Sequence, residues 1–528
     1  MTQLFIGHKP GVGPVLKVLR YDTDDPLTLP NAAYDRYYFN SESQHLSYVF
    51  TAEPFYFRAA DIAALPTDFD LYGYWISGHY GNASSWKLTD VFFRVSNKFS
   101  EFGYPPIPEI REKDLNTGRV SAGRRRLTMI YDTLSKEAGY VEHYQYKYQM
   151  MRVGSYASSS WQTVPLTYQG KLISAYSRIG IGEWVVPMVS QYVYNDNRNQ
   201  MVTYPQVWDL PADSSPMRTY TYAGGLLGLE INQSRVALAR PGYDVNASGL
   251  HTKIIDSNRA PALCIMAGEV TNVAADSSVT LYPPPGITIS DTAVTEFMYR
   301  RVGGPWFVPG FIAAGYVRST RFDLSYSVAS NAVTIHNEGT DPVDIRYVVF
   351  NTDRSGTSTG GNRVMFRGND GSRDYVQIKK PGTSDPASKP NDILLDTRFP
   401  SFQIISEGYI PLSSFSDAPS GEHQLRGKKK YTVSFTNNGF IPYLKFMIVF
   451  PNCVTTPYVN MAYNYTGTPT WGPPSNVSVL AQVDNSQVTF WASPGNWSRY
   501  ENDEGDLKYR YDLPDPIGVR YYVFGIAQ

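Results

Sequence analysis

The sequence predicts an all-β protein, and three observations support this expectation. Aromatic residues make up 14% of the 528 residues, and 42 glycines and 37 prolines punctuate the chain. Many short runs rich in Val, Ile, Tyr and Phe alternate in polarity, which is typical of half-buried strands. In addition, one short motif recurs along the chain. We therefore expect tandem antiparallel β-sandwich domains, Ig-like or jelly-roll-like, with long loops rich in Gly, Pro and Tyr.

The recurring motif has the same order of parts in each copy. An alternating strand reaches a basic residue, Pro-Gly then makes a turn, and a later strand ends in Asp or Asn followed by Ser or Thr. The copies at 235–257 and 375–397 keep the same spacing from proline to aspartate, and a looser copy opens the chain, with 38–41 as its second half. Proline presets the first turn angle, and glycine takes the positive φ of a type II turn. The expected structural turn residues are Lys9, Pro10, Gly11, Arg240, Pro241, Gly242, Asp256, Lys380, Pro381, Gly382 and Asp396.

The motif predicts scaffold and not catalysis, because its terminal Asp/Asn-Ser/Thr pair is suited to side-chain-to-backbone hydrogen bonds. Each copy is expected to begin one domain: 1–225 with a Tyr-rich insertion, 226–372, and 373–528 with a C-terminal extension. A second repeat supports this division, since Asp341–Phe350 is nearly copied by Asp515–Phe524. Residues 104–109 are expected to form a loop, because three prolines there cannot donate to a strand ladder.

Composition limits the function classes. The net charge of −1 and the pI of about 6.7 argue against a nucleic-acid binder. No apolar run is long enough for a membrane span, and the start of the chain lacks the pattern of a signal peptide, so folding in a reducing cytosol is expected. Cys264 and Cys453 stand far apart in apolar runs and are expected to be buried free thiols.

A search for chemistry finds no recognisable site. None of the seven histidines stands in a metal-binding motif, and 74–81 matches a serine-hydrolase elbow only in part. We therefore expect no catalytic, cofactor-binding or metal-binding residues, and no enzyme. A carboxylate pair for glycoside hydrolysis leaves no sequence signature, so a hydrolase stays an alternative. The acidic turns 369–374 and 501–506 could offer oxygens to Ca²⁺, but neither has EF-hand spacing and solvated loops are expected.

Three stretches carry a resemblance: Phe5–Gly11 with Tyr38–Ser43, Val236–Asp244, and Ile393–Thr397. They resemble modules in tail and baseplate proteins of tailed bacteriophages. The resemblance covers a minor part of the chain and brings no catalytic residues. It implies a structural or adhesive virion subunit at the tail tip or baseplate that attaches or forms host-receptor-binding parts.

The resemblance also implies partners and location. These are other virion tail proteins, further copies of the chain in a trimer or hexamer, and a host cell-surface receptor or glycan. The expected location is the virion tail, assembled in the host cytoplasm. The alternatives are a tail-associated hydrolase of surface polysaccharide or peptidoglycan, and a capsid decoration subunit. Binding is expected in the segments between motif copies, especially 151–225 and 453–512.

Overall fold

A computed structural model gives the architecture of the chain. It describes residues 3–43, 46, 49–51, 55–56, 71–79, 86–95, 104, 106–114, 117–121, 127–128, 167–168, 171–172, 184–194, 201–259, 262–308, 324–337, 339, 341–350, 356–419, 429–449, 454–455, 478–493, 498–501, 507–510 and 517–527. These residues are mostly β-strand in antiparallel sheets and contain no α-helix, so the prediction of an all-β fold is confirmed.

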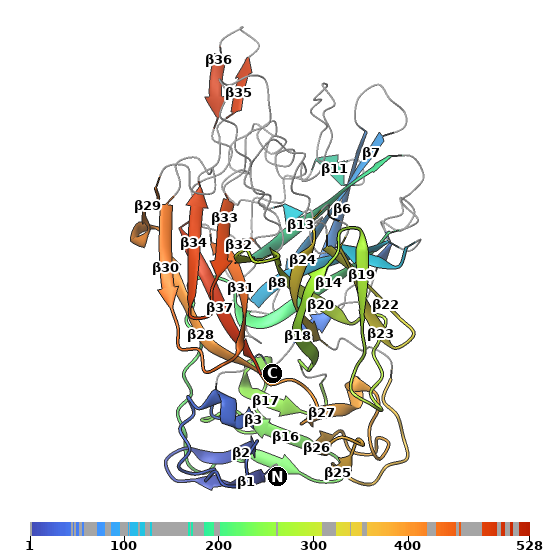
Figure 1. Cartoon of the computed structure of the whole chain (residues 1–528), viewed down its shortest axis with the longest axis vertical. Coiled ribbons are helices and arrows are strands. Elements are labelled where there is room, and N and C mark those ends of the chain that lie inside the picture. Colours follow the sequence, from blue (N-terminus) through green and yellow to red (C-terminus); the bar gives the residue numbers. More distant parts are fainter. Residues whose placement is uncertain are drawn as a thin grey trace.

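Three small three-stranded sheets lie together at one end of the elongated molecule (Figure 1). They are β1 (Gln3–Lys9), β2 (Gly13–Leu19) and β3 (Tyr37–Asn40); β15 (Leu229–Ile231), β16 (Val236–Ala239) and β17 (Lys253–Asp256); and β25 (Met365–Asn369), β26 (Asp374–Lys379) and β27 (Ile393–Asp396). A 3-10 helix precedes the third strand of each sheet: η1 (Tyr34–Arg36), η7 (Leu250–Thr252) and η8 (Pro390–Asp392). We call these sheets, with their connections, modules 1, 2 and 3, and together the base.

Two eight-stranded sheets form much of the body above the base. The first contains β19 (Ser277–Leu281), β23 (Ala332–Asn337), β22 (Leu324–Ala329), β9 (Arg119–Ser121), β8 (Pro106–Asp114), β14 (Met201–Pro211), β4 (Val49–Thr51) and β5 (Phe55–Tyr56). The second contains β18 (Cys264–Val273), β24 (Val343–Phe350), β20 (Val294–Arg301), β21 (Trp306–Phe307), β33 (Ser478–Val483), β34 (Gln487–Ser493), β30 (Lys429–Ser434) and β29 (Ser416–Asp417). The first sheet joins strands from both sides of position 225, and the second joins strands from both sides of position 372. The predicted domain boundaries at 225 and 372 therefore stay a prediction. Each of these two hydrogen-bonded sheets contains strands from both sides of one boundary.

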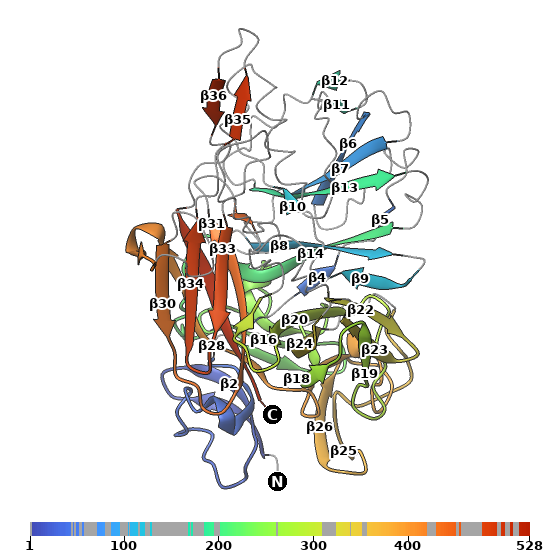
Figure 2. The ribbon, with the colours of Figure 1, turned by 45° about the horizontal axis from the view of Figure 1, so that its top comes forward.

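Four further sheets complete the described strands. They are β28 (Phe402–Pro411), β37 (Gly518–Ile526), β31 (Ile441–Val449) and β32 (Val454–Thr455), with η9 (Leu412–Ser414) after β28; β10 (Leu127–Thr128), β13 (Trp184–Tyr194), β7 (Trp86–Val95) and β6 (Leu71–His79); β11 (Thr167–Tyr168) with β12 (Lys171–Leu172); and β35 (Ser498–Glu501) with β36 (Leu507–Arg510). Figure 2 shows β6, β7 and β13 beyond β8 and β14, on the side away from the base.

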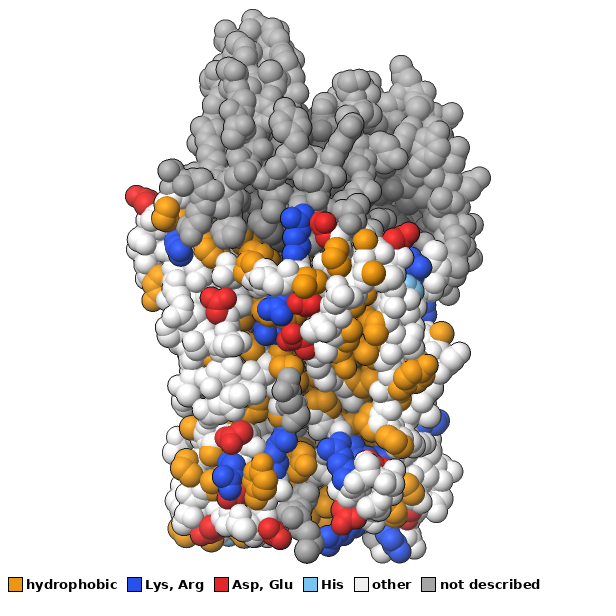
Figure 3. All heavy atoms as spheres, viewed as in Figure 1, with side chains coloured by type: hydrophobic (Ala, Val, Ile, Leu, Met, Phe, Trp, Pro, Cys, Tyr) orange, Lys and Arg blue, Asp and Glu red, His pale blue; other side chains and the backbone are white. Residues whose placement is uncertain are grey.

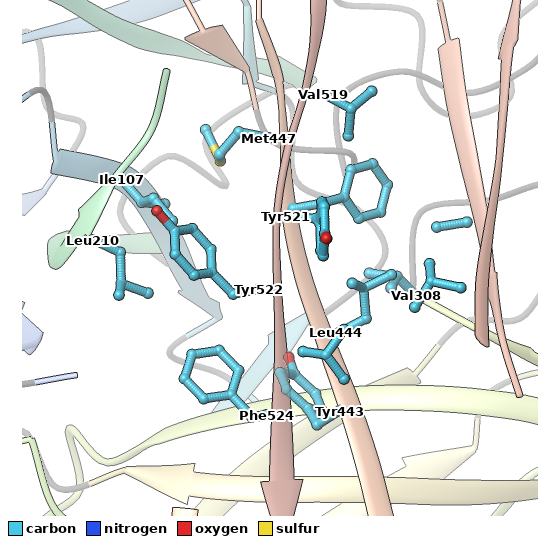
Figure 4. Packing of buried hydrophobic residues seen from close by; sticks show 14 of the residues in the cluster. Ile107, Leu210, Val308, Tyr443, Leu444, Met447, Val519, Tyr521, Tyr522 and Phe524 are labelled. Carbon is cyan, nitrogen blue, oxygen red and sulfur yellow. The ribbon is translucent and has the colours of Figure 1, made fainter. Parts of the chain in front are cut away.

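The sheets pack face to face as β-sandwiches. In one core, Phe297 and Ile345 of the second eight-stranded sheet meet Tyr326 and Ile335 of the first. In the other, apolar side chains of β31 and β37 pack against those of β33 and β34. Figure 4 shows part of this second core, where the Tyr522 ring points toward Ile107 and Leu210. The Tyr522 hydroxyl donates to the Pro211 carbonyl at 2.6 Å and so links β37 to the end of β14.

The two near-identical runs noted in the sequence become central strands of different sheets. Asp341–Phe350 supplies β24, between β18 and β20, and Asp515–Phe524 supplies most of β37, between β28 and β31. A strand paired on both edges and covered on both faces needs a nearly continuous apolar run, which both stretches provide. Each also carries one buried arginine at the same point. Arg346 is paired with Glu269 at 3.1 Å, and Arg520 is paired with Glu407.

The loop expected at 104–109 is wrong in part, because β8 begins at Pro106 and pairs with β14. Pro106 and Pro108 are two residues apart, so their nitrogens face the same side of the strand. On the side opposite β14, the described partner of β8 is β9, which pairs only at Lys113. Among the described residues, the stretch of β8 that contains both prolines has no strand partner on that side, so prolines facing that way remove no described ladder hydrogen bond.

Candidate functional site: the three-module base

The three modules share one set of hydrogen bonds, made by the Asp/Asn-Ser/Thr pair that ends each third strand. The hydroxyl accepts from a backbone N–H in the middle strand: Leu16 to Ser41 at 3.0 Å, Val236 to Ser257 at 3.1 Å and Val376 to Thr397 at 3.0 Å. The preceding carboxylate or amide oxygen accepts from the N–H two residues on: Asn40 from Glu42, Asp256 from Asn258 and Asp396 from Arg398. Side-chain-to-backbone bonds of the kind expected from the sequence are therefore present in all three copies.

Strand register establishes which residues correspond between modules. Lys17 pairs with Asn40, Ala237 with Asp256, and Gln377 with Asp396. An irregularity then follows directly after Val18, Leu238 and Ile378. The three modules are thus structural repeats as well as sequence repeats.

This correspondence corrects the alignment of the first motif copy. The N–H of Arg240 donates to the Thr252 carbonyl, and that of Lys380 donates to Asp392, just before the third strand. In module 1 the same bond runs from Arg20 to Arg36. The structural counterpart of the basic residue is therefore Arg20, whereas Lys9-Pro10-Gly11 lies one connection earlier, between β1 and β2. The long insertion after Arg20 hid this match, because no Pro-Gly follows it.

All three Pro-Gly pairs nevertheless form turns of the expected kind. The glycines have φ of +76° at Gly11, +85° at Gly242 and +75° at Gly382. In each turn a backbone N–H donates to the carbonyl of the basic residue three positions earlier: Val12 to Lys9, Tyr243 to Arg240 and Thr383 to Lys380. The geometry is shared, although the first turn has a different place in its module.

The modules pack on one another around a shared core. Val18, Leu238 and Ile378 occupy corresponding positions, and all three lie in the same apolar cluster. The cluster also contains Leu16, Val236, Ile254, Ile255, Leu394 and Leu395. Burying one such side chain stabilises a protein by about 1.5–3 kcal/mol. Because each module contributes to the same cluster, the base is one packed unit made from three distant parts of the sequence.

Each module also buries one lysine, which ties the connection after its middle strand to the sheet. Lys17 Nζ donates to the Pro26 carbonyl at 2.8 Å, Lys253 Nζ to Ala247 at 2.5 Å and Lys379 Nζ to Thr383 at 2.6 Å. Buried ammonium groups need such partners, since desolvation is costly. Burial lowers the pKa of Lys253. The only sequence signal for Lys17 is a charge inside the apolar run 15–19, which opposes the strand prediction locally.

Residues 217–228, which we call the strap, contact both module 1 and module 2. They pack on Arg240, which lies between the base and the body. The Arg240 guanidinium lies 5.0 Å from the centre of the Tyr220 ring, and the Tyr222 ring contacts His8 in module 1. Arg240 is buried, as is Asp209 at the end of β14, whose carboxylate accepts from the Tyr104 hydroxyl at 2.6 Å. Burial raises the pKa of Asp209, and the positive charge of Arg240 opposes this shift. The cluster joins base and body but includes no nucleophile activated by a base.

The outside of the base carries apolar side chains. Of the ten large hydrophobic residues that are exposed in the described part of the chain, seven belong to or adjoin the modules: Ile6, Tyr21, Leu27, Leu226, Leu227, Ile231 and Met365. Figure 3 shows hydrophobic and charged side chains interspersed over one face of the base. Apolar surface rimmed by charge is typical of protein–protein contact sites.

Other expected features fall partly on described residues. Cys264 is a buried free thiol, and burial raises its pKa, whereas Cys453 lies outside the described residues. In the turn 369–374, Asp370 Oδ1 accepts from the Ser372 hydroxyl and from the N–H groups of Ser372 and Arg373, and the hydroxyl bond leads the causes that lower the pKa of Asp370 to about 2. The turn 501–506 and the segments 151–225 and 453–512 are described only in part.

Two further findings concern the described residues alone. They contain no group of three or more His, Cys, Asp or Glu side chains that could hold a metal ion. No helix among them is long and apolar enough to cross a membrane.

Fold and site together define an all-β protein whose three repeated modules form one base under a body of β-sandwiches. No protein-family model, no curated protein and no solved structure matches the chain.

Proposed function

We propose that this chain is a structural or adhesive component of a phage virion, at the tail tip or baseplate. The base attaches to other virion tail proteins, and the segments between the modules attach or form the parts that bind a host receptor or glycan. The chain acts as one of several copies, in a trimer or hexamer, and is assembled into the tail in the host cytoplasm. It works by binding and is not an enzyme.

One observation carries this proposal: three motif copies that are far apart in the sequence come together in one base. The chain leaves the base after module 1, returns for module 2, leaves again, returns for module 3, and then continues into the last sandwich. In Figure 1 the described strands outside the modules lie on one side of the base. This arrangement suits a subunit of a particle, because the base can keep its structure while the segments inserted between the modules vary.

The exposed apolar residues of the base support the same assignment. Leu227 and Met365 are each about half exposed, at 49% and 50%. Clusters of exposed apolar side chains are typical of surfaces that a partner covers. The resemblance of the motif copies to phage tail modules indicates which kind of partner to test first.

Immunogold labelling of purified virions tests the location. Tail-tip labelling is expected, and labelling over the head would instead favour a capsid decoration subunit. Purified protein should also bind host cells saturably without releasing product. Release of reducing ends from surface polysaccharide, abolished by a single carboxylate change, would favour the hydrolase alternative.

Paired surface variants test the base directly. Leu227→Asp and Met365→Asp place a charge on the proposed contact surface, so each should lower incorporation into particles while the purified chain stays folded. The control is Val302→Asp, since Val302 is 52% exposed but lies outside the modules. Equal incorporation of all three variants would contradict attachment through the base.

A further inference from the structure

Three polar side chains of module 1 meet where β2 and β3 pair. Lys17 and Asn40 stand directly opposite each other in the strand register, and both residues are fully buried. Glu42, two residues after Asn40, places its carboxylate 2.5 Å from Lys17 Nζ. A salt bridge would need only the lysine and the glutamate. The buried amide beside them adds a group that a lysine amine can attack.

The register places these two side chains directly opposite each other, on the same face of the sheet. In module 3 the corresponding residues are Gln377 and Asp396, and Gln377 Nε2 donates to Asp396 Oδ2 at 2.8 Å. Residues directly opposite on antiparallel strands point to the same face of the sheet. Lys17 is longer than Gln377, so its side chain is long enough to bring the amine to the amide carbon of Asn40. In this structure the amine contacts the Pro26 carbonyl and Glu42, and it must leave that carbonyl to attack.

The surroundings of the Asn40 amide suit substitution at its carbon. Its oxygen accepts a hydrogen bond from the Glu42 N–H at 3.1 Å, which would stabilise negative charge developing on that oxygen. Its nitrogen donates to Asn31 Oδ1 at 2.9 Å, which holds the leaving group in place. The buried Tyr37 ring lies 5.7 Å from Lys17 Nζ and helps to exclude water.

Glu42 is placed to move the protons. Burial raises its pKa, but hydrogen bonds from Lys17 and Lys9 outweigh this effect and hold the pKa below its ordinary value. The carboxylate is therefore ionised, and its direct contact with Lys17 Nζ provides the path along which a proton can pass between the two groups. A buried lysine that loses its proton to a neighbouring base becomes a nucleophile.

We propose that Lys17 and Asn40 join in an intramolecular isopeptide bond that ties β2 to β3. Glu42 takes a proton from Lys17, and the neutral amine attacks Asn40 Cγ. A bond forms between Lys17 Nζ and Cγ, the bond from Cγ to Nδ2 breaks, and Nδ2 leaves with protons returned through Glu42. The charge balances, because the lysine ammonium is consumed and one ammonium ion is released, and no oxidant or cofactor is needed. Holding the groups together replaces a bimolecular encounter with a unimolecular step.

The bond can form only in module 1. Modules 2 and 3 have Ala237 and Gln377 at the position of Lys17, and neither side chain is an amine nucleophile. The three modules together should therefore lose one molecule of ammonia.

Intact-mass spectrometry of the denatured full-length chain is the test. The expected mass is that of the sequence less one ammonia. Trypsin cannot cut after an acylated lysine, so digestion should yield a branched peptide joining Met1–Arg20 to Tyr37–Arg58. This branched peptide separates the cross-link from ammonia loss by other routes.

Conservative variants complete the experiment. Lys17→Arg keeps the positive charge and removes the amine, and Glu42→Gln keeps the size and removes the base. Both should show the full mass of their sequences and no branched peptide. A wild-type chain of full mass would overturn the proposal, and so would ammonia loss that persists in Lys17→Arg. The proposed attachment function is independent of either result.

Discussion

Shortening one core side chain of module 2 should loosen all three modules together. Leu238 is 1% exposed, lies in the shared core of the base, and occupies the position matched by Val18 and Ile378. Leu238→Ala removes most of a buried side chain and leaves a cavity, which costs about 2–5 kcal/mol in comparable cores. At 1.4 kcal/mol for each factor of ten, a loss of about 3 kcal/mol corresponds to a roughly 100-fold larger equilibrium constant for opening.

Amide hydrogen exchange followed by mass spectrometry measures the opening of each strand separately. This suits a chain of several β-sandwiches better than the midpoint of a single global unfolding transition. Exchange should accelerate in β2, β16 and β26 together. The matched control is Ile231→Ala in β15, whose side chain is 40% exposed and should change stability by less than about 0.5 kcal/mol. Acceleration confined to β16 and its neighbours in module 2 would refute the shared core and favour three independent modules.

Two further predictions concern the junction between base and body. Gly242→Ala should destabilise the chain more than Gly382→Ala, by about 1–3 kcal/mol from overpacking. Both glycines have positive φ, but only a Cβ at Gly242 would meet a backbone atom, the Thr221 carbonyl oxygen at 2.3 Å. Equal melting temperatures of the two variants would contradict the close approach of the strap. Because burial raises the pKa of Asp209, the stability that this group contributes is fully present below the ordinary aspartate pKa of 3.8 and is lost as the pH rises through the folded-state pKa. Asp209→Asn, which can still accept from Tyr104, should flatten the dependence of unfolding on pH above 3.8, and a slope unchanged from wild type would show that another group is responsible.

The sequence predicted local structure well at positions where a residue type has one strong conformational or hydrogen-bonding preference. The positive φ at Gly242 and Gly382 follows from the Pro-Gly pair, and the hydroxyl bonds of Ser257 and Thr397 follow from their place after an aspartate. Strand positions such as 343–350 followed from their apolar content. These features depend on neighbours a few positions away, so a local pattern is sufficient to predict them.

The buried charges were not predictable in the same way. Lys17 interrupts an apolar strand, and its partner Glu42 is brought close only when β2 pairs with β3. The sequence predicts Arg240 as an exposed turn residue, yet it is buried and its guanidinium lies against the Tyr220 ring of the strap. Both placements depend on contacts with segments that are distant in sequence or separated by an insertion, and the motif spacing carries no information about those contacts.

The sequence by itself determined that this protein is built from strands, that three modules repeat, and which residues make their turns. Tertiary structure decided that the modules form one base and that Arg20, not Lys9, is the counterpart of Arg240 and Lys380. The physical reason is that turn and strand preferences act over a few residues, whereas each module leaves an apolar face that the other modules cover. Val18, Leu238 and Ile378 meet in one core because burying them together removes more apolar surface from water than any module can bury alone.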